Sequence, residues 1–311
     1  MNGDGSQANP WIITTWDELI SDNRQNTDYC EWHGGDINLN DIRPQGYTSG
    51  VVIKGRIDFK GATIRNYCCS LVRYSSSNEF GIRFNTGANS TSGYVKNLNL
   101  LNMYMRTNGV APFITFSGSE NRFVTVTNCR FSGYFIDNSS SSSTSHIIDI
   151  PGRSGYTAEQ HIDNCAFNIR TQRSGSGTTD LFHTNNAYIN NCRFQLDMKM
   201  NSNNNLNSNT DNYWGRFTDC KFTGRVYWKT SGLDTSTYVQ LTGANCSNNV
   251  FLFDFGSYGI QASALNITND NKKDSQDNYI LCYSGGTQCT DAQLGNAQYL
   301  SDLGFPIVVP N

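Results

Sequence analysis

VTNCRF at residues 126–131 is the first of four segments that read apolar-x-Asn/Asp-Cys-x-Phe; the others are IDNCAF (162–167), INNCRF (189–194) and FTDCKF (217–222). Weaker copies precede them, IRNYCC (64–69) and VKNLNL (95–100), and follow them, NVFL (249–252) and NYIL (278–281). The Asn or Asp marker thus recurs at positions 66, 97, 128, 164, 191, 219, 249 and 278, in steps of 27 to 36 residues. Self-similarity at such a period indicates a repeat architecture.

Within each unit the apolar residues alternate around the marker. Cys129 and Phe131 lie two residues apart, and Val126 lies two before Asn128, so strands on either side of a bend would turn all three inward. Asn tolerates the left-handed backbone that a sharp bend requires. We therefore expect three ladders, with steps of about 4.8 Å between stacked strands. Their members are Asn128, Asn164, Asn191 and Asp219; Cys129, Cys165, Cys192 and Cys220; and Phe131, Phe167, Phe194 and Phe222.

The steps are too irregular for a helical repeat, whose length is set by packing, but they suit short strands joined by turns that tolerate insertions. An antiparallel sandwich also has short strands, with turn signals about every 8–12 residues and no register shared along the chain. A motif that returns near every 30 residues favours the all-β, right-handed parallel β-helix, with about eight to nine coils.

The segment VIKGRIDFKGATIRN (52–66), followed by the Asn-Cys-x-Phe series, resembles the pectate-lyase-like right-handed parallel β-helix proteins. The opening GDGS (3–6) with NPWIITTWDE (9–18), and the ending YLSDLGFPI (299–307), resemble β-helical proteins encoded by tailed phages and prophages. The resemblance covers nearly the whole chain. It implies this fold and a viral setting, whereas the lyase signature motifs are missing.

Both ends of the repeat carry helix signals. TWDE (15–18) is a capping box that predicts a short helix through Leu19 and Ile20, and TDAQ (290–293) predicts a second helix over 294–303 that ends at Gly304. We expect a single domain over residues 1–311. It would have an N-terminal cap at 1–35, coils at 36–285, and a C-terminal helix and tail at 286–311.

Composition limits the partners. The net charge is −3 and the isoelectric point about 5.8, which argues against a nucleic-acid partner. No run of 18 apolar residues is present, so no membrane partner is expected, and the first residues lack the basic and apolar regions of a signal peptide. We therefore expect synthesis in a host cytoplasm and localisation in a virion. The ten cysteines, several at one point of the repeat, are expected to be reduced, buried residues.

Candidate catalytic and metal-binding residues give no consistent site. Eight carboxylates fall near the expected coils: Asp58, Asp137, Asp149, Glu159, Asp163, Asp180, Asp197 and Asp219. They form no Asp ladder, although stacking could still bring two of them together. The four histidines show no metal-ligand spacing, so neither a metal nor a cofactor is expected. Four aromatic residues do not fit the ladder register, and we consider them either contact residues or core packing: Tyr213, Trp214, Tyr227 and Trp228.

These observations predict a protein that binds rather than catalyses. The expected role is a phage virion structural or attachment protein, such as a capsid decoration, a head fibre or a tail component. Its expected partners are other virion proteins, further copies of the chain in a homo-oligomer such as a trimer, and a cell-surface glycan. The alternatives are a glycan-binding receptor protein and a polysaccharide depolymerase acting as a lyase or hydrolase.

Overall fold

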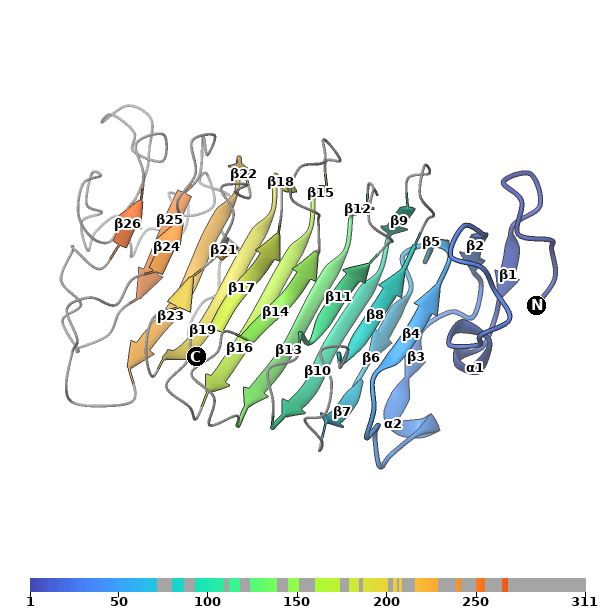
Figure 1. Ribbon diagram of the computed structural model, residues 1–311, viewed down its shortest axis with the longest axis horizontal. Helices are drawn as coiled ribbons and strands as arrows, with labels where there is room; N and C mark the ends of the chain where they lie inside the picture. Colours follow the sequence, from blue (N-terminus) through green and yellow to red (C-terminus); the bar gives the residue numbers. More distant parts are fainter. Residues whose placement is uncertain are drawn as a thin grey trace.

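The computed structural model describes residues 1–71, 80–86, 93–108, 112–117, 124–138, 145–150, 160–173, 179–184, 187–200, 204–205, 207–208, 216–228, 239–241, 250–254 and 265–267. In this part of the chain almost all regular structure is β-strand, and each described pair of neighbouring strands runs parallel. The all-β class with parallel sheets is therefore confirmed. Figure 1 shows the strands side by side along the long axis of the molecule, in chain order from the N-terminal end.

Three sheets contain most of the strands. Sheet A has the order β1 (Trp11–Ile13), β2 (Tyr29–Trp32), β5 (Arg56–Asp58), β9 (Gly93–Lys96), β12 (Val124–Thr127), β15 (Gln160–Asp163), β18 (Ala187–Asn190), β22 (Arg216–Thr218). Sheet B has the order β3 (Ile37–Asn38), β6 (Thr63–Arg65), β10 (Asn99–Thr107), β13 (Arg130–Asp137), β16 (Ala166–Arg173), β19 (Arg193–Met200), β23 (Lys221–Trp228), β25 (Val250–Asp254), and β7 (Cys68–Leu71) also pairs with β10.

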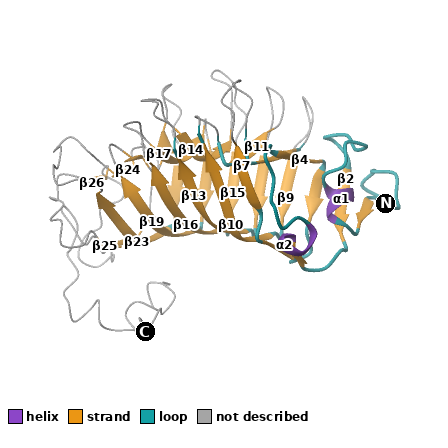
Figure 2. Ribbon diagram, turned by 90° about the horizontal axis from the view of Figure 1, so that it is seen from below, coloured by secondary structure: helices purple, strands orange, loops and turns teal. Residues whose placement is uncertain are grey.

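Sheet C and a smaller sheet complete the set. Sheet C has the order β4 (Val51–Lys54), β8 (Ile82–Asn85), β11 (Ile114–Ser117), β14 (Ser145–Ile150), β17 (Thr179–Thr184), β21 (Asn207–Ser208). The smaller sheet pairs β20 (Asn204–Asn205), β24 (Val239–Leu241) and β26 (Leu265–Ile267). From β8 to β19 the chain visits sheets C, A and B in that fixed order, so each strand from β8 to β16 pairs with the strand three places on. Figure 2 shows these strands from a second direction.

A two-residue bend connects sheet A to sheet B at each copy of the motif. Strand β12 ends one residue before Asn128 and β13 begins two residues after it, and the same holds at Asn164 and Asn191. Each of these residues has a positive φ, between 49° and 56°. Asn accepts this left-handed conformation at low cost because its short polar side chain can bond locally. The marker residue is therefore what allows so short a connection.

The N-terminal segment already belongs to the sheets. Strands β1 and β2 lie within residues 1–35 and are the first two strands of sheet A. The predicted helix is present as α1 (Trp16–Leu19), and its capping box is confirmed, since Thr15 Oγ1 accepts from the Glu18 N–H at 3.2 Å. A second short helix, α2 (Leu39–Ile42), was not predicted; Asn38 caps it. The helix expected over 294–303 lies outside the described residues.

Candidate functional site

The marker residues lie on the outside of the bend between sheets A and B. Asn128, Asn164, Asn191 and Asp219 are all exposed and have φ between 49° and 56°. Two amide contacts join successive markers: Asn128 Nδ2 donates to Asn97 Oδ1 at 3.3 Å, and Asn191 Nδ2 donates to Asn164 Oδ1 at 2.7 Å. The bend is thus held by side-chain hydrogen bonds that run along the stack of strands.

The four cysteines of the motif lie inside the bend. Cys129, Cys165, Cys192 and Cys220 are buried and unpaired by disulfides. Each thiol donates to the carbonyl oxygen two residues before it, at 3.3 to 3.4 Å. Burial raises the pKa of the Cys129 and Cys192 thiols well above the usual value. Protonated, shielded thiols of this kind are packing groups rather than nucleophiles.

The phenylalanines of the motif point into the space between the sheets. Phe131, Phe167 and Phe194 stack face to face, with ring centroids 5.4 Å and 5.0 Å apart. Phe182 of sheet C packs edge-on against two of these rings, at 5.5 Å and 5.7 Å. For Phe222 the structure describes only the backbone, which pairs in register with Phe194. This column of rings makes the sheets a rigid support for whatever the outer faces carry.

A groove of about 680 Å³ lies on the outer face of sheet B, beside the bend. Its volume falls within the range of about 300–1,000 Å³ that ligand sites usually have. Exposed or half-exposed polar groups line most of it: Asn128, Arg130, Ser132, Asn164, Asn168, Asn191, Arg193, Gln195 and Lys221. Amides and hydroxyls do not titrate near neutral pH, and Arg and Lys side chains are cationic there. The described lining therefore offers hydrogen bonds and positive charge.

The cations of this groove occupy the variable position of the repeat, the x of Asn-Cys-x-Phe. Arg130, Ala166, Arg193 and Lys221 pair in one register across four strands of sheet B. The carboxylates, histidines and aromatic residues that were candidates from the sequence do not include this row of cations. An alignment of the four motif copies on their Asn or Asp would have revealed it.

A further row on the same face combines aromatic and basic side chains. Tyr104, Tyr134 and Arg170 share a register position, and Tyr104 is exposed. The Arg170 guanidinium lies over the Tyr134 ring at 5.0 Å, while Tyr134 Oη donates to Gln172 Oε1 at 2.7 Å. No sequence signal located this row, because the register of β10 shifts between Leu100 and Met103.

The aromatic residues proposed as contacts from the sequence are only partly described. Tyr213 and Trp214 lie outside the described residues. Tyr227 and Trp228 end strand β23, and their backbones pair with Lys199 and Met200 of β19. For these two residues the structure describes the backbone alone, so their role as contact residues stays a prediction.

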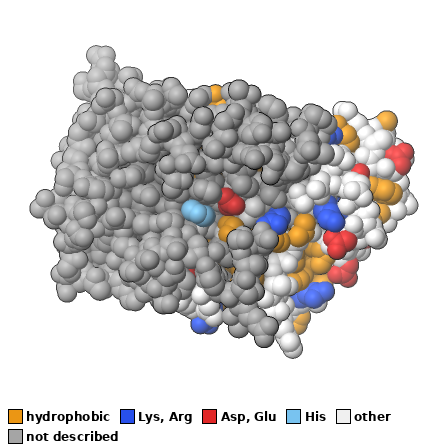
Figure 3. All heavy atoms as spheres, viewed as in Figure 1, with side chains coloured by type: hydrophobic (Ala, Val, Ile, Leu, Met, Phe, Trp, Pro, Cys, Tyr) orange, Lys and Arg blue, Asp and Glu red, His pale blue; other side chains and the backbone are white. Residues whose placement is uncertain are grey.

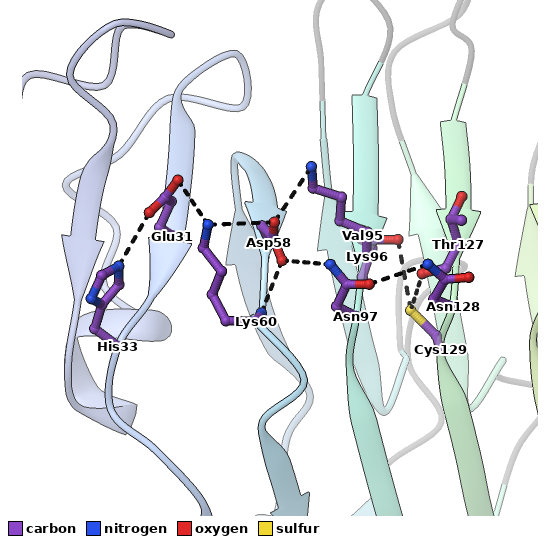
Figure 4. Close-up of polar contacts among 10 residues, drawn as sticks. All are labelled: Glu31, His33, Asp58, Lys60, Val95, Lys96, Asn97, Thr127, Asn128 and Cys129. Atoms are coloured by element: carbon purple, nitrogen blue, oxygen red, sulfur yellow. Dashed lines mark hydrogen bonds and ion pairs between the residues drawn. The ribbon is translucent and has the colours of Figure 1, made fainter.

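Two carboxylates do meet by strand stacking, at the N-terminal end of sheet A. Glu31 of β2 pairs in register with Asp58 of β5. Lys60 Nζ bridges them, at 3.1 Å from Glu31 Oε1 and 3.7 Å from Asp58 Oδ2, and Lys96 Nζ lies 3.4 Å from Asp58 Oδ2 (Figure 4). His33 Nε2 lies 3.1 Å from Glu31 Oε2. Each acidic group of this network thus has a cationic or imidazole partner.

The ionisation of this pair argues against an acid–base role. Burial acts to raise the pKa of Asp58, yet the Asn97 amide, the Lys60 N–H and the two ammonium groups outweigh it and lower that pKa. Contacts with His33 and Lys60 lower the pKa of Glu31 as well. A general acid at neutral pH needs a raised pKa, so this pair is better suited to holding the sheet together. Charges of both signs also lie side by side on the face shown in Figure 3.

The other predicted carboxylates and histidines are dispersed. Asp137 is buried, Asp163 accepts from Asn190 Nδ2 at 2.8 Å, and Glu159 lies outside the described residues. On sheet C, Asp149 of β14 pairs in register with Thr115 of β11 and with His183 of β17. Within the described ranges no three His, Cys, Asp or Glu side chains are grouped as a metal site would need.

None of the helices in the described residues is long and apolar enough to cross a membrane. Comparison of the chain with protein-family models, with curated proteins and with solved structures found no match.

Proposed function

We propose that the chain is a right-handed parallel β-helix with short capping helices, in which one coil is one passage through sheets C, A and B. The fixed order of the sheets supports this arrangement, because a chain that returns to each sheet once per repeat winds around one core. The side-chain ladders support it further, since equivalent residues of successive repeats contact one another.

On this fold we propose a non-enzymatic attachment protein of a phage virion, as a capsid decoration, head fibre or tail component. The groove on the outer face of sheet B is the observation that carries the attachment role. It is a preformed surface of amide, hydroxyl, guanidinium and ammonium groups, mounted on a stacked aromatic core. Such groups bind sugar hydroxyls and protein surfaces well. The viral setting rests on the resemblance of the chain's two ends, and its partners are other virion proteins and a surface glycan.

Attachment fits this surface better than bond cleavage does. Cleavage of a glycosidic bond needs two groups in reach of one bond, one to give a proton and one to take a proton or attack. The described lining of the groove supplies donors and cations, and the stacked carboxylates Glu31 and Asp58 are both held ionised by cations elsewhere. Because the residues of this site lie on paired strands, binding a ligand there does not require the backbone to be ordered.

The experiment has two arms. Mass spectrometry of density-purified virions should identify the chain among the virion proteins, and labelled protein should attach to host cells. In the second arm, the wild-type protein is incubated with host surface polymers while reducing ends and unsaturated products are measured. We expect attachment without product. Recovery of the chain only from the cell lysate would contradict the virion role, and steady product release would contradict the non-enzymatic role.

A polysaccharide depolymerase is the second candidate, and one observation favours it. Thr115, Asp149 and His183 occupy one register position on neighbouring strands of sheet C, which places a carboxylate beside two other polar residues. Under this alternative, Asp149→Asn would abolish product release, whereas Asp163→Asn, on sheet A, would not. The non-enzymatic proposal expects no product from the wild type or from either variant.

A further inference from the structure

The outer face of sheet B carries a row of positive charge that follows the long axis of the molecule. Arg193 and Lys221 are register partners on neighbouring strands, and Arg130 lies two strands before Arg193, with Ala166 between them. Neighbouring strands are about 4.8 Å apart, so the three cations extend over about 15 Å. The row is parallel to the stacking direction and perpendicular to the strands.

This row works against the stability of the sheet. Like charges directly opposite each other on neighbouring strands are destabilising, and Arg193 and Lys221 have that relation. In the described part of the chain none of the three cations forms an ion pair, whereas Lys54, Lys60 and Lys96 each do. The chain as a whole is acidic, with a net charge of −3. Three unneutralised cations in one groove therefore favour an anionic partner at this place.

The rows beside the cations are suited to sugar rings. Ser132, Asn168 and Gln195 share the next outward register position of sheet B and supply hydroxyl and amide groups. Beyond them lie Tyr104 and Tyr134, whose ring centroids are 6.0 Å apart. Amides and hydroxyls exchange hydrogen bonds with sugar hydroxyls, and the exposed Tyr104 side chain offers an apolar surface that loses little entropy on contact.

We infer that the groove binds a glycan chain bearing carboxylate or phosphate groups, laid across the strands with its negative charges along Arg130, Arg193 and Lys221. This inference rests on the proposed attachment function and names the ligand of its site. A glycan is favoured over a nucleic acid because the described lining of the groove places amide and hydroxyl groups, which match sugar hydroxyls, beside its three cations.

The test uses the full-length chain and a charge-removal variant, Arg130→Gln/Arg193→Gln/Lys221→Gln. The control is Arg43→Gln, which removes an exposed cation next to α2, where the guanidinium lies 5.1 Å from the centroid of the Tyr47 ring. Binding is measured by calorimetry to four probes: hyaluronan, a ribitol-phosphate teichoic polymer, neutral dextran and single-stranded DNA. Each titration is run at ionic strengths of about 0.1 M and about 1 M, between which the Debye length falls from about 10 Å to about 3 Å.

We expect at least one of the two anionic glycans to bind, and to bind more weakly at the higher salt. The triple variant should lose at least about tenfold in affinity, as the sum of three exposed charge contacts, and Arg43→Gln should bind as the wild type does. Preference for hyaluronan or for the teichoic polymer would identify carboxylate or phosphate as the anion. The melting temperature of the triple variant should not fall, because the substitution removes a like-charge contact.

Three results would overturn the inference. One is dextran binding as tight as that of both anionic glycans; another is DNA binding tighter than either; the third is failure to bind either anionic glycan. A parallel assay of attachment to host cells separates this inference from the proposed function. If the triple variant attaches to cells as the wild type does, the anionic ligand is wrong while the attachment role remains. If the wild type does not attach at all, the attachment role itself is wrong.

Discussion

Replacement of Phe194 by alanine tests how the molecule is held together. The Phe194 side chain is 1% exposed, and its ring stacks on that of Phe167 at 5.0 Å with an angle of 6° between the planes. Phe182 and Phe217 contact it edge-on, at 5.7 Å and 6.1 Å. The ring therefore connects strand β19 to strands of all three large sheets.

The expected loss follows from burial and from these ring contacts. Truncation of a buried phenylalanine to alanine costs about 3–5 kcal/mol through lost transfer free energy and the cavity left behind. Aromatic pairs add about 0.5–1.5 kcal/mol beyond the area that they bury. Because Phe194 contacts three rings that cannot all move into the cavity, we expect a loss of unfolding free energy in the upper part of that range, about 4–5 kcal/mol. Phe194→Leu, which keeps most of the volume, should lose about 1–1.5 kcal/mol.

The measurement is urea unfolding followed by far-ultraviolet circular dichroism and by tryptophan fluorescence, with coincident transitions required before free energies are compared. Gln195→Ala is the matched control: it is the next residue of the same strand and lies on the outer face, so its effect should stay within about 0.5 kcal/mol. A shift of one residue in register exchanges the two faces of a strand. A loss below about 1 kcal/mol for Phe194→Ala, or a larger loss for Gln195→Ala, would therefore refute the packing described here.

Three further predictions follow from the bends and the buried groups. Asn128→Ala should lower the unfolding free energy by about 1–2 kcal/mol, because its φ of 55° is strained for alanine, whereas Asn128→Gly should be nearly neutral; equal losses would show that the side chain and not the backbone matters. The Cys129 and Cys192 thiols should react with a thiol reagent only after unfolding, and rapid native reaction would contradict their burial. The pKa of Asp58 is lower in the folded chain than in the unfolded chain, so the stability that the ionised Asp58 carboxylate contributes should be complete above about pH 4 and lost as the pH falls through the folded pKa. The melting temperature of Asp58→Asn should therefore be lower than that of the wild type at neutral pH, and it should fall less on acidification.

Much of the fold could be predicted from the repeat, because the bends and the inward-facing positions depend on residues that are close together in the sequence. An Asn between two alternating apolar runs indicates a left-handed bend between strands, and Asn128, Asn164 and Asn191 all adopt that conformation. Residues two apart on a strand face the same side, and Cys129 and Phe131 are both buried. The capping box at Thr15 acts within a single turn of helix, so it too could be recognised without any tertiary contact.

Part of the candidate groove can be recognised in the sequence, at the variable position of the motif. Arg130, Arg193 and Lys221 occupy one position of the motif. Strands β13, β19 and β23 each begin two residues after the marker residue, so residues at the same motif position also share a register position in sheet B. The charge row on sheet B is therefore a property of the repeat itself.

Only the tertiary structure decided the remaining neighbours. Tyr104 pairs in register with Tyr134 because the register of β10 shifts between Leu100 and Met103. Asp149 pairs in register with Thr115 although the connections between successive strands differ in length. Glu31 and Asp58 also meet across strands, outside the Asn-Cys-x-Phe motif. In each case the register is set by main-chain hydrogen bonds between strands about 30 residues apart, and these form without regard to the length of the connection. The sequence by itself determines which residues bend the chain and which face inward. Which outer side chains become neighbours depends on how the strands pair, because the sequence of a connecting segment does not specify which residues of the two strands lie opposite each other.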